Sequence, residues 1–229
     1  MSQAPDRSQP ATLIAFVNQK GGPGKTTLAM HVASELARAG AGVLVADADP
    51  QATATRWAAA APEDRPFPAA LAGLSHAGEK LHRELMKHLN PYDFIVVDCP
   101  PSAESNLTRS ALLVAELAVV PVVPSPPDLW AGVAISQVLT DVSVVNDRLK
   151  ARLVVNRYKA RTRLAAHTPD LLAQYGIPVL RAQIGEREAF RHAAATGVTV
   201  ADLPRAGQAA GEITALTEEL LLVLNGASP

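Results

Sequence analysis

Residues Lys20–Thr27 read KGGPGKTT, and they lie between a run of apolar residues and a helical pattern. The apolar run, Leu13–Val17, is typical of a buried strand, and the alanine- and leucine-rich pattern from Leu28 is typical of a helix. Three glycines let the backbone N–H groups of the loop point towards one centre: Gly21, Gly22 and Gly24. The following helix aims the positive end of its dipole there. The sequence therefore predicts a polyphosphate site, and we call residues 20–27 the phosphate loop.

Side chains of the phosphate loop have the chemistry of a nucleotide–magnesium site. Lys25 would place its ammonium group on the β- and γ-phosphates, and the hydroxyl of Thr26 would bind Mg²⁺, with Thr27 completing the cradle. The standard spacing G-x-x-x-x-G-K-[ST] requires glycine at position 19, where this chain has Gln19. The chain has instead a second lysine, Lys20. The loop is a variant whose predicted ligands are ATP and Mg²⁺.

The composition fits one globular α/β domain of 229 residues, 48% hydrophobic and 19% charged. The 21 Lys and Arg residues balance 22 Asp and Glu, so affinity for nucleic acid would have to come from a local patch. The single cysteine, Cys99, excludes an internal disulfide and argues against an iron–sulfur cluster. No apolar run reaches the length of a membrane span, and residues 1–10 lack a signal-peptide core, so we predict a cytoplasmic protein.

Strand patterns alternate with helical patterns along the chain. After the strand at 12–18, strands are predicted at residues 43–47, 67–71, 92–98, 117–123, 151–156 and 179–184. Helices are predicted at residues 26–39, 53–60, 79–89, 106–114, 129–149, 167–174, 186–195 and 209–224. This alternation implies right-handed βαβ crossovers, and we predict a single doubly wound, mostly parallel sheet with helices on both faces. Residues 1–10 are expected to form a flexible tail and residues 11–229 one domain.

Carboxylates follow two of the predicted strands, at the sheet edge where the phosphate loop lies. Asp98 ends an apolar run, where its carboxylate could hold Mg²⁺ directly or through a water. Asp47 and Asp49 leave the second strand in the sequence DADPQ. An attacking water must be oriented by a polar group, and no Gln or Glu is better placed than Asp49. The alternative for Asp98 is a simple cap at the end of its strand, and the alternative for Asp47 and Asp49 is an Asx turn before Pro50.

Asn156 follows another strand, in the sequence Asn156-Arg157-Tyr158-Lys159. GTPases of related topology carry N-K-x-D here, and the aspartate accepts hydrogen bonds from guanine. Lys159 cannot accept, whereas the amide of Asn156 can pair with N6 and N7 of adenine, so ATP is favoured. The alternative for Asn156 is a simple turn after the strand.

Four segments together resemble the motifs of the ParA/MinD superfamily of deviant Walker A ATPases: KGGPGKTT, DADPQ, FIVVDCPPS and PVVPSPPD. The resemblance covers Thr12 to about Leu224 and is closest to small ParF-type ParA proteins. It implies a slow, Mg²⁺-dependent ATPase that forms a homodimer with ATP and binds DNA without sequence preference. It also implies a ParB-like or adaptor partner that stimulates hydrolysis, a cargo such as a plasmid, chromosome region or carboxysome, and a nucleoid-associated location.

The resemblance also assigns roles to single residues. It gives Asp49 the orientation of the attacking water, Asp47 the support of the loop or of the Mg²⁺ shell, and Lys20 a contact with the phosphates of the other subunit. Pro23 departs from the family, which more often has valine or serine there. Proline removes one backbone N–H from the phosphate cradle.

Other members of this fold define the alternatives. A MinD-like protein would end in a basic amphipathic helix for membrane binding, but residues 212–224 contain three glutamates and no Lys or Arg. That helix is expected to pack on the sheet. A bacterial tyrosine kinase would have a C-terminal tyrosine cluster, and the last tyrosine here is Tyr175. A small-molecule ligase or synthetase of the same fold stays open as the alternative function.

The carboxyl half contains a basic stretch, because no acidic residue lies between Arg148 and Arg163. Arg187 and Arg191 follow, four residues apart on a predicted helix and hence on one face. The residues predicted to bind DNA phosphates are Arg161, Arg163, Arg187 and Arg191. The alternative is a solvated loop and helix surface.

Overall fold

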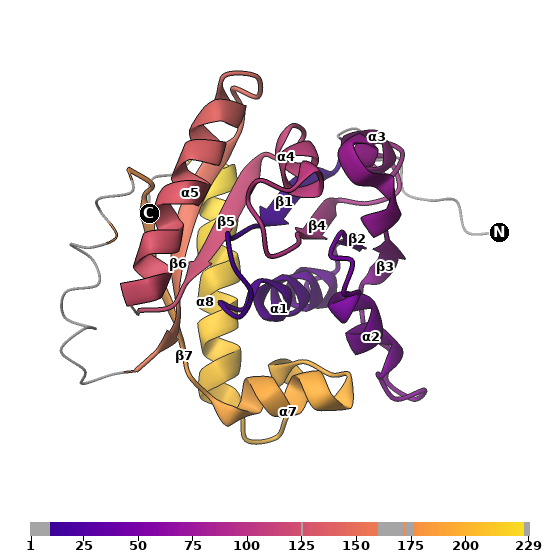
Figure 1. The fold of residues 1–229 in the computed structure, drawn as a ribbon. Helices are drawn as coiled ribbons and strands as arrows, with labels where there is room; N and C mark the ends of the chain where they lie inside the picture. Colours follow the sequence, from indigo (N-terminus) through magenta and orange to yellow (C-terminus); the bar gives the residue numbers. More distant parts are fainter. Residues whose placement is uncertain (1–9, 125, 160–171, 173–175, 227–229) are drawn as a thin grey trace.

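A computed structural model describes residues 10–124, 126–159, 172 and 176–226 (Figure 1). Within these described ranges, seven parallel strands form one sheet in the order β3-β2-β4-β1-β5-β6-β7. The strands are β1 (Thr12–Phe16), β2 (Val43–Asp47), β3 (Ala70–Gly73), β4 (Phe94–Asp98), β5 (Leu117–Val122), β6 (Lys150–Tyr158) and β7 (Val179–Gly185). The predicted doubly wound parallel fold is confirmed, and the described sheet has no antiparallel pair.

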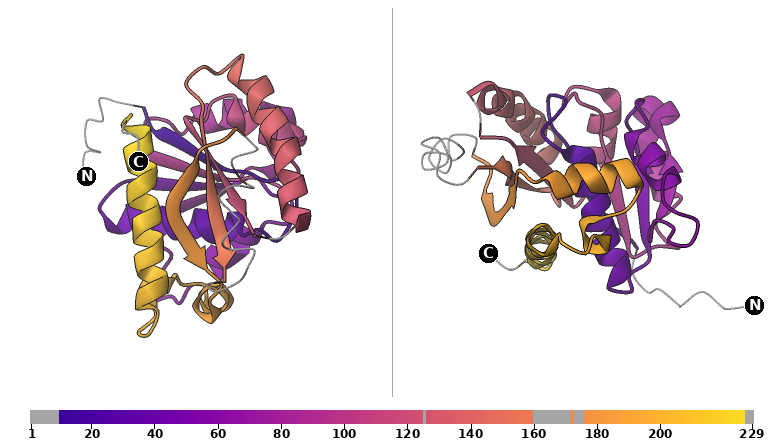
Figure 2. Two further views of the ribbon diagram at one scale, coloured as in Figure 1. Left: turned by 90° about the vertical axis from the view of Figure 1, so that its left-hand side faces the viewer. Right: turned by 90° about the horizontal axis from the view of Figure 1, so that it is seen from below.

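Helices cover both faces of the sheet (Figure 2). One face is covered by α1 (Lys25–Arg38), α2 (Thr53–Ala59), α7 (Glu188–Thr196) and α8 (Gly207–Leu224). The other face is covered by η1 (Ser75–Lys80), α3 (Leu81–Met86), α4 (Asn106–Leu112) and α5 (Pro126–Ser143). Successive residues of β1 enter opposite cores, since Ile14 packs with α1 whereas Leu13 and Ala15 pack with α4. This burial on both faces explains the continuous apolar runs of the central strands.

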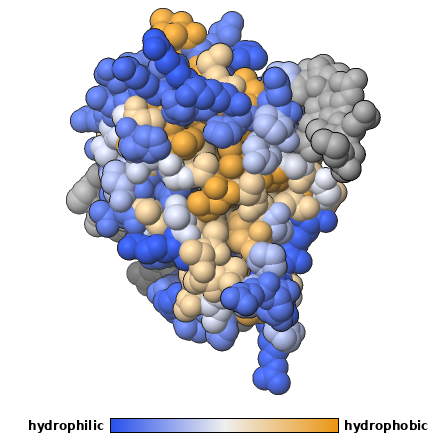
Figure 3. Space-filling view, turned by 90° about the vertical axis from the view of Figure 1, so that its right-hand side faces the viewer, coloured by the Kyte–Doolittle hydropathy of each residue, from blue (hydrophilic) through white to orange (hydrophobic). Residues whose placement is uncertain are grey.

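Helix α8 closes the β7 edge of the sheet through two carboxylates. Glu219 accepts the backbone N–H groups of Arg181 and Ala182, each at 2.8 Å, and Glu212 accepts that of Gly185 at 3.0 Å. These bonds satisfy donors that an edge strand would otherwise expose. Glu212 and Glu219 of the last helix therefore have a structural role, and the helix packs on the sheet as predicted. At the opposite edge of the sheet, the side of the molecule where α2, β3 and α3 lie carries a column of apolar side chains (Figure 3).

Several predicted boundaries were wrong. Helix α5 begins at Pro126 inside the proline-rich motif, because proline is tolerated in a first helical turn, and it ends at Ser143 rather than 149. The expected helix at 79–89 is divided into η1 and α3, and Gly78 within η1 has non-helical angles (φ 55°, ψ −133°). The weak strand expected at 67–71 lies at 70–73. Of the helix expected at 167–174, residue 172 alone is described, and residues 1–9 of the expected tail lie outside the described residues.

Within the described ranges, none of the helices is both long enough and apolar enough to span a membrane.

Candidate nucleotide-binding site

The phosphate loop connects β1 to α1 and has the left-handed glycines that the sequence predicts. Gly24 is the N-cap of α1 with φ 96° and ψ 26°, and Gly22 has φ 99°. A Cβ at Gly24 would lie 2.2 Å from Nδ2 of Asn156, so both the backbone angle and the space require glycine there. The loop therefore leads into the N-terminus of a 14-residue helix, an arrangement suited to a phosphate.

Lys25 is buried against the loop that it belongs to. Its side chain is 6% exposed, and Nζ donates to the backbone carbonyl of Lys20 at 3.2 Å. Burial lowers the pKa of Lys25, and the nearby Asp98 carboxylate opposes that shift. The ammonium group is thus held at the loop by one carbonyl, which a phosphate could replace as a stronger partner.

Thr26 and Asp98 meet at the carboxyl end of the central strands. The hydroxyl of Thr26 donates to Oδ2 of Asp98 at 2.7 Å, while Oδ1 of Asp98 is buried and has no hydrogen-bond partner among the described residues. Burial, helped by the carboxylate of Asp47, its register partner on β2, raises the pKa of Asp98 to about 7, although the hydrogen bond from Thr26 opposes the shift. A buried carboxylate oxygen without a partner beside a hydroxyl suits a hard cation such as Mg²⁺ or one of its waters.

Asp47 organises the turn that carries Asp49. Its Oδ2 accepts the backbone N–H (2.8 Å) and the hydroxyl (2.7 Å) of Thr55, and its Oδ1 accepts the N–H of Asp49 at 3.2 Å. Of the two roles expected for Asp47, the contacts favour loop support, and the Mg²⁺ role stays a prediction. Asp49 is 9% exposed, and its Oδ1 accepts the N–H of Gln51 at 2.9 Å. The Asx turn therefore exists, and the water-orienting role of Asp49 stays a prediction.

Two residues before the glycines also hold the loop, and neither was among the predicted site residues. Oε1 of Gln19 accepts the N–H of Ala103 at 2.8 Å, and Nδ2 of Asn18 donates to the carbonyl of Pro121 at 2.5 Å. Gln19 occupies the position where the standard motif has glycine, and this replacement is the signal that could have found it. These two bonds tie the phosphate loop to the segments after β4 and in β5. The role of Lys20 towards a second subunit stays a prediction.

A small pocket of about 130 Å³ adjoins the phosphate loop between α1 and α7. Its lining includes Gly24, Thr27, Asn156, Phe190 and Arg191. This position beside the loop suits the base or sugar of a nucleotide. Asn156 nevertheless uses its amide inside the chain, since Nδ2 donates to the carbonyl of Pro23 at 2.6 Å and Oδ1 accepts the N–H of Arg157 at 2.9 Å. The adenine contact of Asn156 stays a prediction that would require some of these bonds to be exchanged.

The two arginines expected on one face of α7 are placed differently from each other, and that expectation was wrong. Arg187 is the extended N-cap of α7 (φ −133°, ψ 141°), and its guanidinium pairs with both carboxylate oxygens of Glu212. Arg191 lies in the helix and pairs with Glu188 at 2.8 Å, where both side chains are more than half exposed. Arg161 and Arg163 lie outside the described residues. Among the four predicted DNA contacts, Arg191 is thus an exposed cation on described structure.

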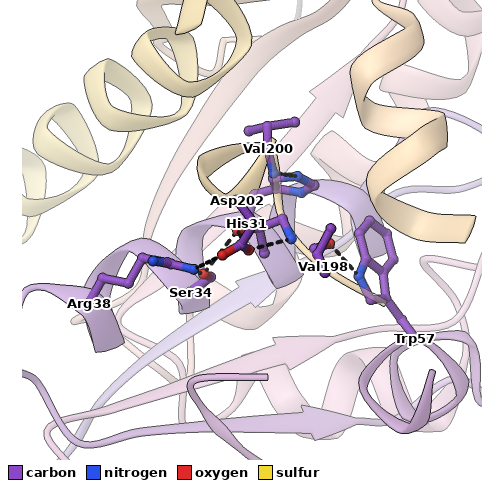
Figure 4. A network of polar contacts seen from close by, with 8 residues as sticks. His31, Ser34, Arg38, Trp57, Val198, Val200 and Asp202 are labelled. Carbon is purple, nitrogen blue, oxygen red and sulfur yellow. Dashed lines mark hydrogen bonds and ion pairs between the residues drawn. The ribbon is translucent and has the colours of Figure 1, made fainter. Parts of the chain in front are cut away.

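A buried histidine joins the phosphate-loop helix to α2 and α7 (Figure 4). Nδ1–H of His31 donates to the carbonyl of Thr27 at 2.7 Å, and Nε2 accepts the N–H of Val200 at 3.2 Å. Its ring makes edge contacts with Trp57 and Phe190, at centroid distances of 5.5 and 5.2 Å. Burial lowers the pKa of His31 to about 4, so the ring is neutral near pH 7. The histidines lack metal-ligand spacing in the sequence, and His31 is a core residue.

Further contacts hold the segment that follows α7 against α1 and α2. The indole N–H of Trp57 donates to the carbonyl of Val198 at 3.0 Å, and Arg38 of α1 pairs with Asp202 (Figure 4). A Cβ at Gly197 would lie 2.2 Å from the backbone of Ala60, so the chain after α7 runs directly against the end of α2. The helix that starts at the phosphate loop is therefore fixed to both neighbouring helices on its face of the sheet.

The fold and the loop geometry define a nucleotide-binding α/β domain of the P-loop class. Residues 14–200 match the family model described as the CobQ/CobB/MinD/ParA nucleotide binding domain, and the chain belongs to this family. The predicted superfamily is thereby confirmed.

Relatives and solved structures agree with this assignment. The chain is 32% identical over 217 residues to "Maintenance of carboxysome distribution protein A" of Halothiobacillus neapolitanus, with 93% of this chain and 98% of the relative covered. It is 31% identical over 240 residues to "Chromosome-partitioning ATPase Soj" of Thermus thermophilus, with 91% and 94% covered. The ATP complex of a Cyanothece McdA variant has the same fold, with a TM-score of 0.76, 16% identity, and 96% and 98% of the chains covered.

Proposed function

We propose that this chain is a slow, Mg²⁺-dependent ATPase that dimerises with ATP, binds DNA non-specifically and positions a cargo together with a partner protein that stimulates hydrolysis. The observation that carries the proposal is the pair Thr26–Asp98 at the mouth of the phosphate loop, with one buried carboxylate oxygen left for a cation. Relatives named for carboxysome distribution and chromosome partitioning support a positioning role. The cargo class remains a plasmid, a chromosome region or a carboxysome.

Each residue of the candidate site has a separate role in phosphoryl transfer. The phosphate loop and Lys25 bind the β- and γ-phosphates, and the hydroxyl of Thr26 and the carboxylate of Asp98 hold Mg²⁺, directly or through water. Bound Mg²⁺ supplies charge neutralisation at the phosphate oxygens. Asp49 orients the attacking water, and Asp47 holds the Asp49 turn by accepting the N–H of Asp49 and the hydroxyl of Thr55. Lys20 of each subunit reaches the phosphates of the other, so dimerisation completes both sites.

The DNA surface would lie in the carboxyl half, around Arg191. The exposed pair between Arg191 and Glu188 contributes little to stability and can be exchanged for a phosphate contact. Arg187, which is bound to Glu212, has mainly a structural role at the start of α7. The chain as a whole has a formal net charge of −1, so DNA binding would depend on presenting this surface twice in a dimer.

The second candidate is a ligase or synthetase acting on a small acid, because a cobyrinic acid a,c-diamide synthase of Mycobacterium smegmatis has the same fold, with a TM-score of 0.72. Measurement of ATP turnover with Mg²⁺ separates the two candidates. Turnover stimulated by duplex DNA of any sequence, with an ATP-dependent shift of the chain onto DNA, supports the positioning ATPase. Turnover that is indifferent to DNA, without DNA binding in ATP, favours the small-molecule enzyme. In cells, a fluorescent fusion is expected to lie over the nucleoid.

A further inference from the structure

The end of β6 departs from regular strand pairing at Asn156 and Arg157. Between Val155 and Tyr158, β6 advances by three residues while the paired part of β7 advances by two. The additional residue forms a β-bulge, and Arg157 within it has φ 53°, in a region that residues other than glycine rarely adopt. Bulges redirect side chains, and a strained backbone persists only where its surroundings hold it. The contacts of the Asn156 side chain are therefore contacts that can hold this irregularity in place.

The amide of Asn156 is bound at both of its ends. Nδ2 donates to the carbonyl of Pro23 at 2.6 Å, and Oδ1 accepts the N–H of Arg157 at 2.9 Å. Because a peptide carbonyl can only accept and a peptide N–H can only donate, these partners determine which way the amide faces. Asn156 is 4% exposed, so water does not compete freely for these bonds.

The two loop residues that Asn156 touches suit this contact. Pro23 has no backbone N–H, so its carbonyl is the only backbone group that it can offer for hydrogen bonding. Gly24 follows directly, and any Cβ there would collide with Nδ2. The carbonyl of Gly24 accepts the first hydrogen bond of α1, from Leu28 at 2.9 Å. Asn156 thus fixes the residue immediately before the turn that begins the phosphate-binding helix.

We propose that Asn156 is a positioning residue that holds the phosphate loop through Pro23, so that its contribution to ligand binding is independent of the nucleotide base. The inference rests on the proposed function, because it assumes that polyphosphates bind at this loop. It differs from the adenine contact expected from the sequence, in which Asn156 would distinguish one base from another. The two roles make opposite predictions for ligands that have no base.

The variant Asn156→Asp tests the proposal, since it keeps the size of the side chain and the acceptor for Arg157 but replaces the donor to Pro23 by a repelling oxygen. We expect about tenfold weaker binding of Mg²⁺-ATP, Mg²⁺-GTP and Mg²⁺-tripolyphosphate alike, measured by calorimetry. In the ligand-free chain, amide hydrogen exchange at residues 20–25 should be faster. The variant Asn156→Ala, which adds no charge, should show the same pattern with a smaller loss.

Asn146→Asp is the matched control. Asn146 is also buried, and its Nδ2 donates to the carbonyls of Leu112 (2.9 Å) and Ala115 (2.7 Å) at the other end of the sheet. The same chemical change there should lower the melting temperature but leave all three affinities and the exchange of the phosphate loop unchanged. A general loss of stability is thereby separated from loss of loop position.

Two results would overturn the positioning role. If the Asn156 variants lose ATP affinity but keep tripolyphosphate affinity, Asn156 contacts the base. If all three affinities and loop exchange equal those of the parent, the loop does not need the contact. A parent chain that binds neither ATP nor tripolyphosphate would instead refute the proposed function, and this inference with it.

Discussion

The hydroxyl of Thr26 and the carboxylate of Asp98 lie 2.7 Å apart, although 72 positions separate them in the sequence. Parallel pairing of β1 with β4 produces this contact, because Phe16 and Asp98 are register partners and the phosphate loop starts directly after β1. The remaining oxygen of Asp98 is buried without a partner among the described residues. Removing this carboxylate from water is therefore unfavourable, and the raised pKa of Asp98 expresses that cost.

Asp98→Asn should separate this cost from the binding of Mg²⁺. The amide keeps an acceptor for Thr26 and removes the buried charge, so the melting temperature without ligands should stay the same or rise. The increase in melting temperature that Mg²⁺-ATP gives the parent should be largely lost, with Mg²⁺ affinity about ten- to hundredfold lower. Thermal unfolding with and without Mg²⁺-ATP measures both effects. An unchanged response to Mg²⁺-ATP would show that Asp98 does not hold the cation.

Lys25 and Asp49 should have separable roles. Lys25→Ala removes the ammonium group from the ground-state phosphates and is expected to abolish ATP binding. Asp49→Ala removes only the group that orients the water, so it should bind ATP with near-parental affinity and fail to hydrolyse it. Equilibrium binding and single-turnover hydrolysis distinguish the two variants. Parental hydrolysis by Asp49→Ala would refute the assignment of Asp49.

Lys20 should act between subunits. Two ammonium groups, of Lys20 and Lys25, would repel each other in one site, whereas the phosphates of a second subunit would be a counter-ion for Lys20. Lys20→Ala is therefore expected to keep part of its ATP affinity and to remain monomeric with ATP. Light scattering gives the mass directly. An ATP-bound dimer of this variant would contradict the role.

Arg191 and Glu188 offer a paired test of DNA binding. Arg191→Ala should weaken binding of any duplex by the ATP-bound dimer, and it should lower the slope of log affinity against log salt by about 0.9 for each phosphate that is no longer neutralised. Glu188→Gln frees the arginine from its ion pair, so binding should stay the same or strengthen. Fluorescence anisotropy over a range of salt gives the slope. Equal slopes for Arg191→Ala and the parent would move the DNA surface elsewhere.

The strand and motif pattern predicted the fold class and placed the phosphate loop, Asp47, Asp49, Asp98 and Asn156 at one edge of the sheet. That success has a physical basis, because parallel strands buried on both faces are continuous apolar runs, and their carboxyl ends share an edge. Local sequence patterns did not predict the contacts of a side chain where its partners lie far away in the sequence. No pattern near Asn156 indicates that its amide binds Pro23, 133 positions away.

The predicted placement of two arginines was wrong for the same reason, because contacts between residues far apart in the sequence decide where a helix begins and which charges pair. Four-residue spacing placed Arg187 and Arg191 on one face, but α7 begins only at Glu188, and Glu212 of α8 binds Arg187. The role of His31 likewise depends on Val200, 169 positions away, and on rings from two other helices. Composition and spacing contain no information about such partners.

The neutral ring of His31 gives the last prediction, which concerns stability at acid pH. The pKa of this histidine is about 4 in the folded chain, against an ordinary value of 6.5, because burial disfavours the charged ring. Between pH 6.5 and pH 4, His31 is therefore protonated in the unfolded chain but neutral in the folded chain. The stabilising effect of the neutral ring is complete above pH 6.5 and is lost as the pH falls towards 4, by about 3 kcal/mol in the free energy of unfolding.

The variant His31→Gln isolates this effect, since it keeps an acceptor for the N–H of Val200 but cannot be protonated. The raised pKa of Asp98 gives a pH dependence of the opposite sign, and it cancels in the comparison because both proteins contain Asp98. Urea unfolding at several pH values should show the parent losing stability relative to the variant between about pH 7 and pH 4. If the two profiles run parallel, His31 is not the buried neutral contact between α1 and the segment that follows α7.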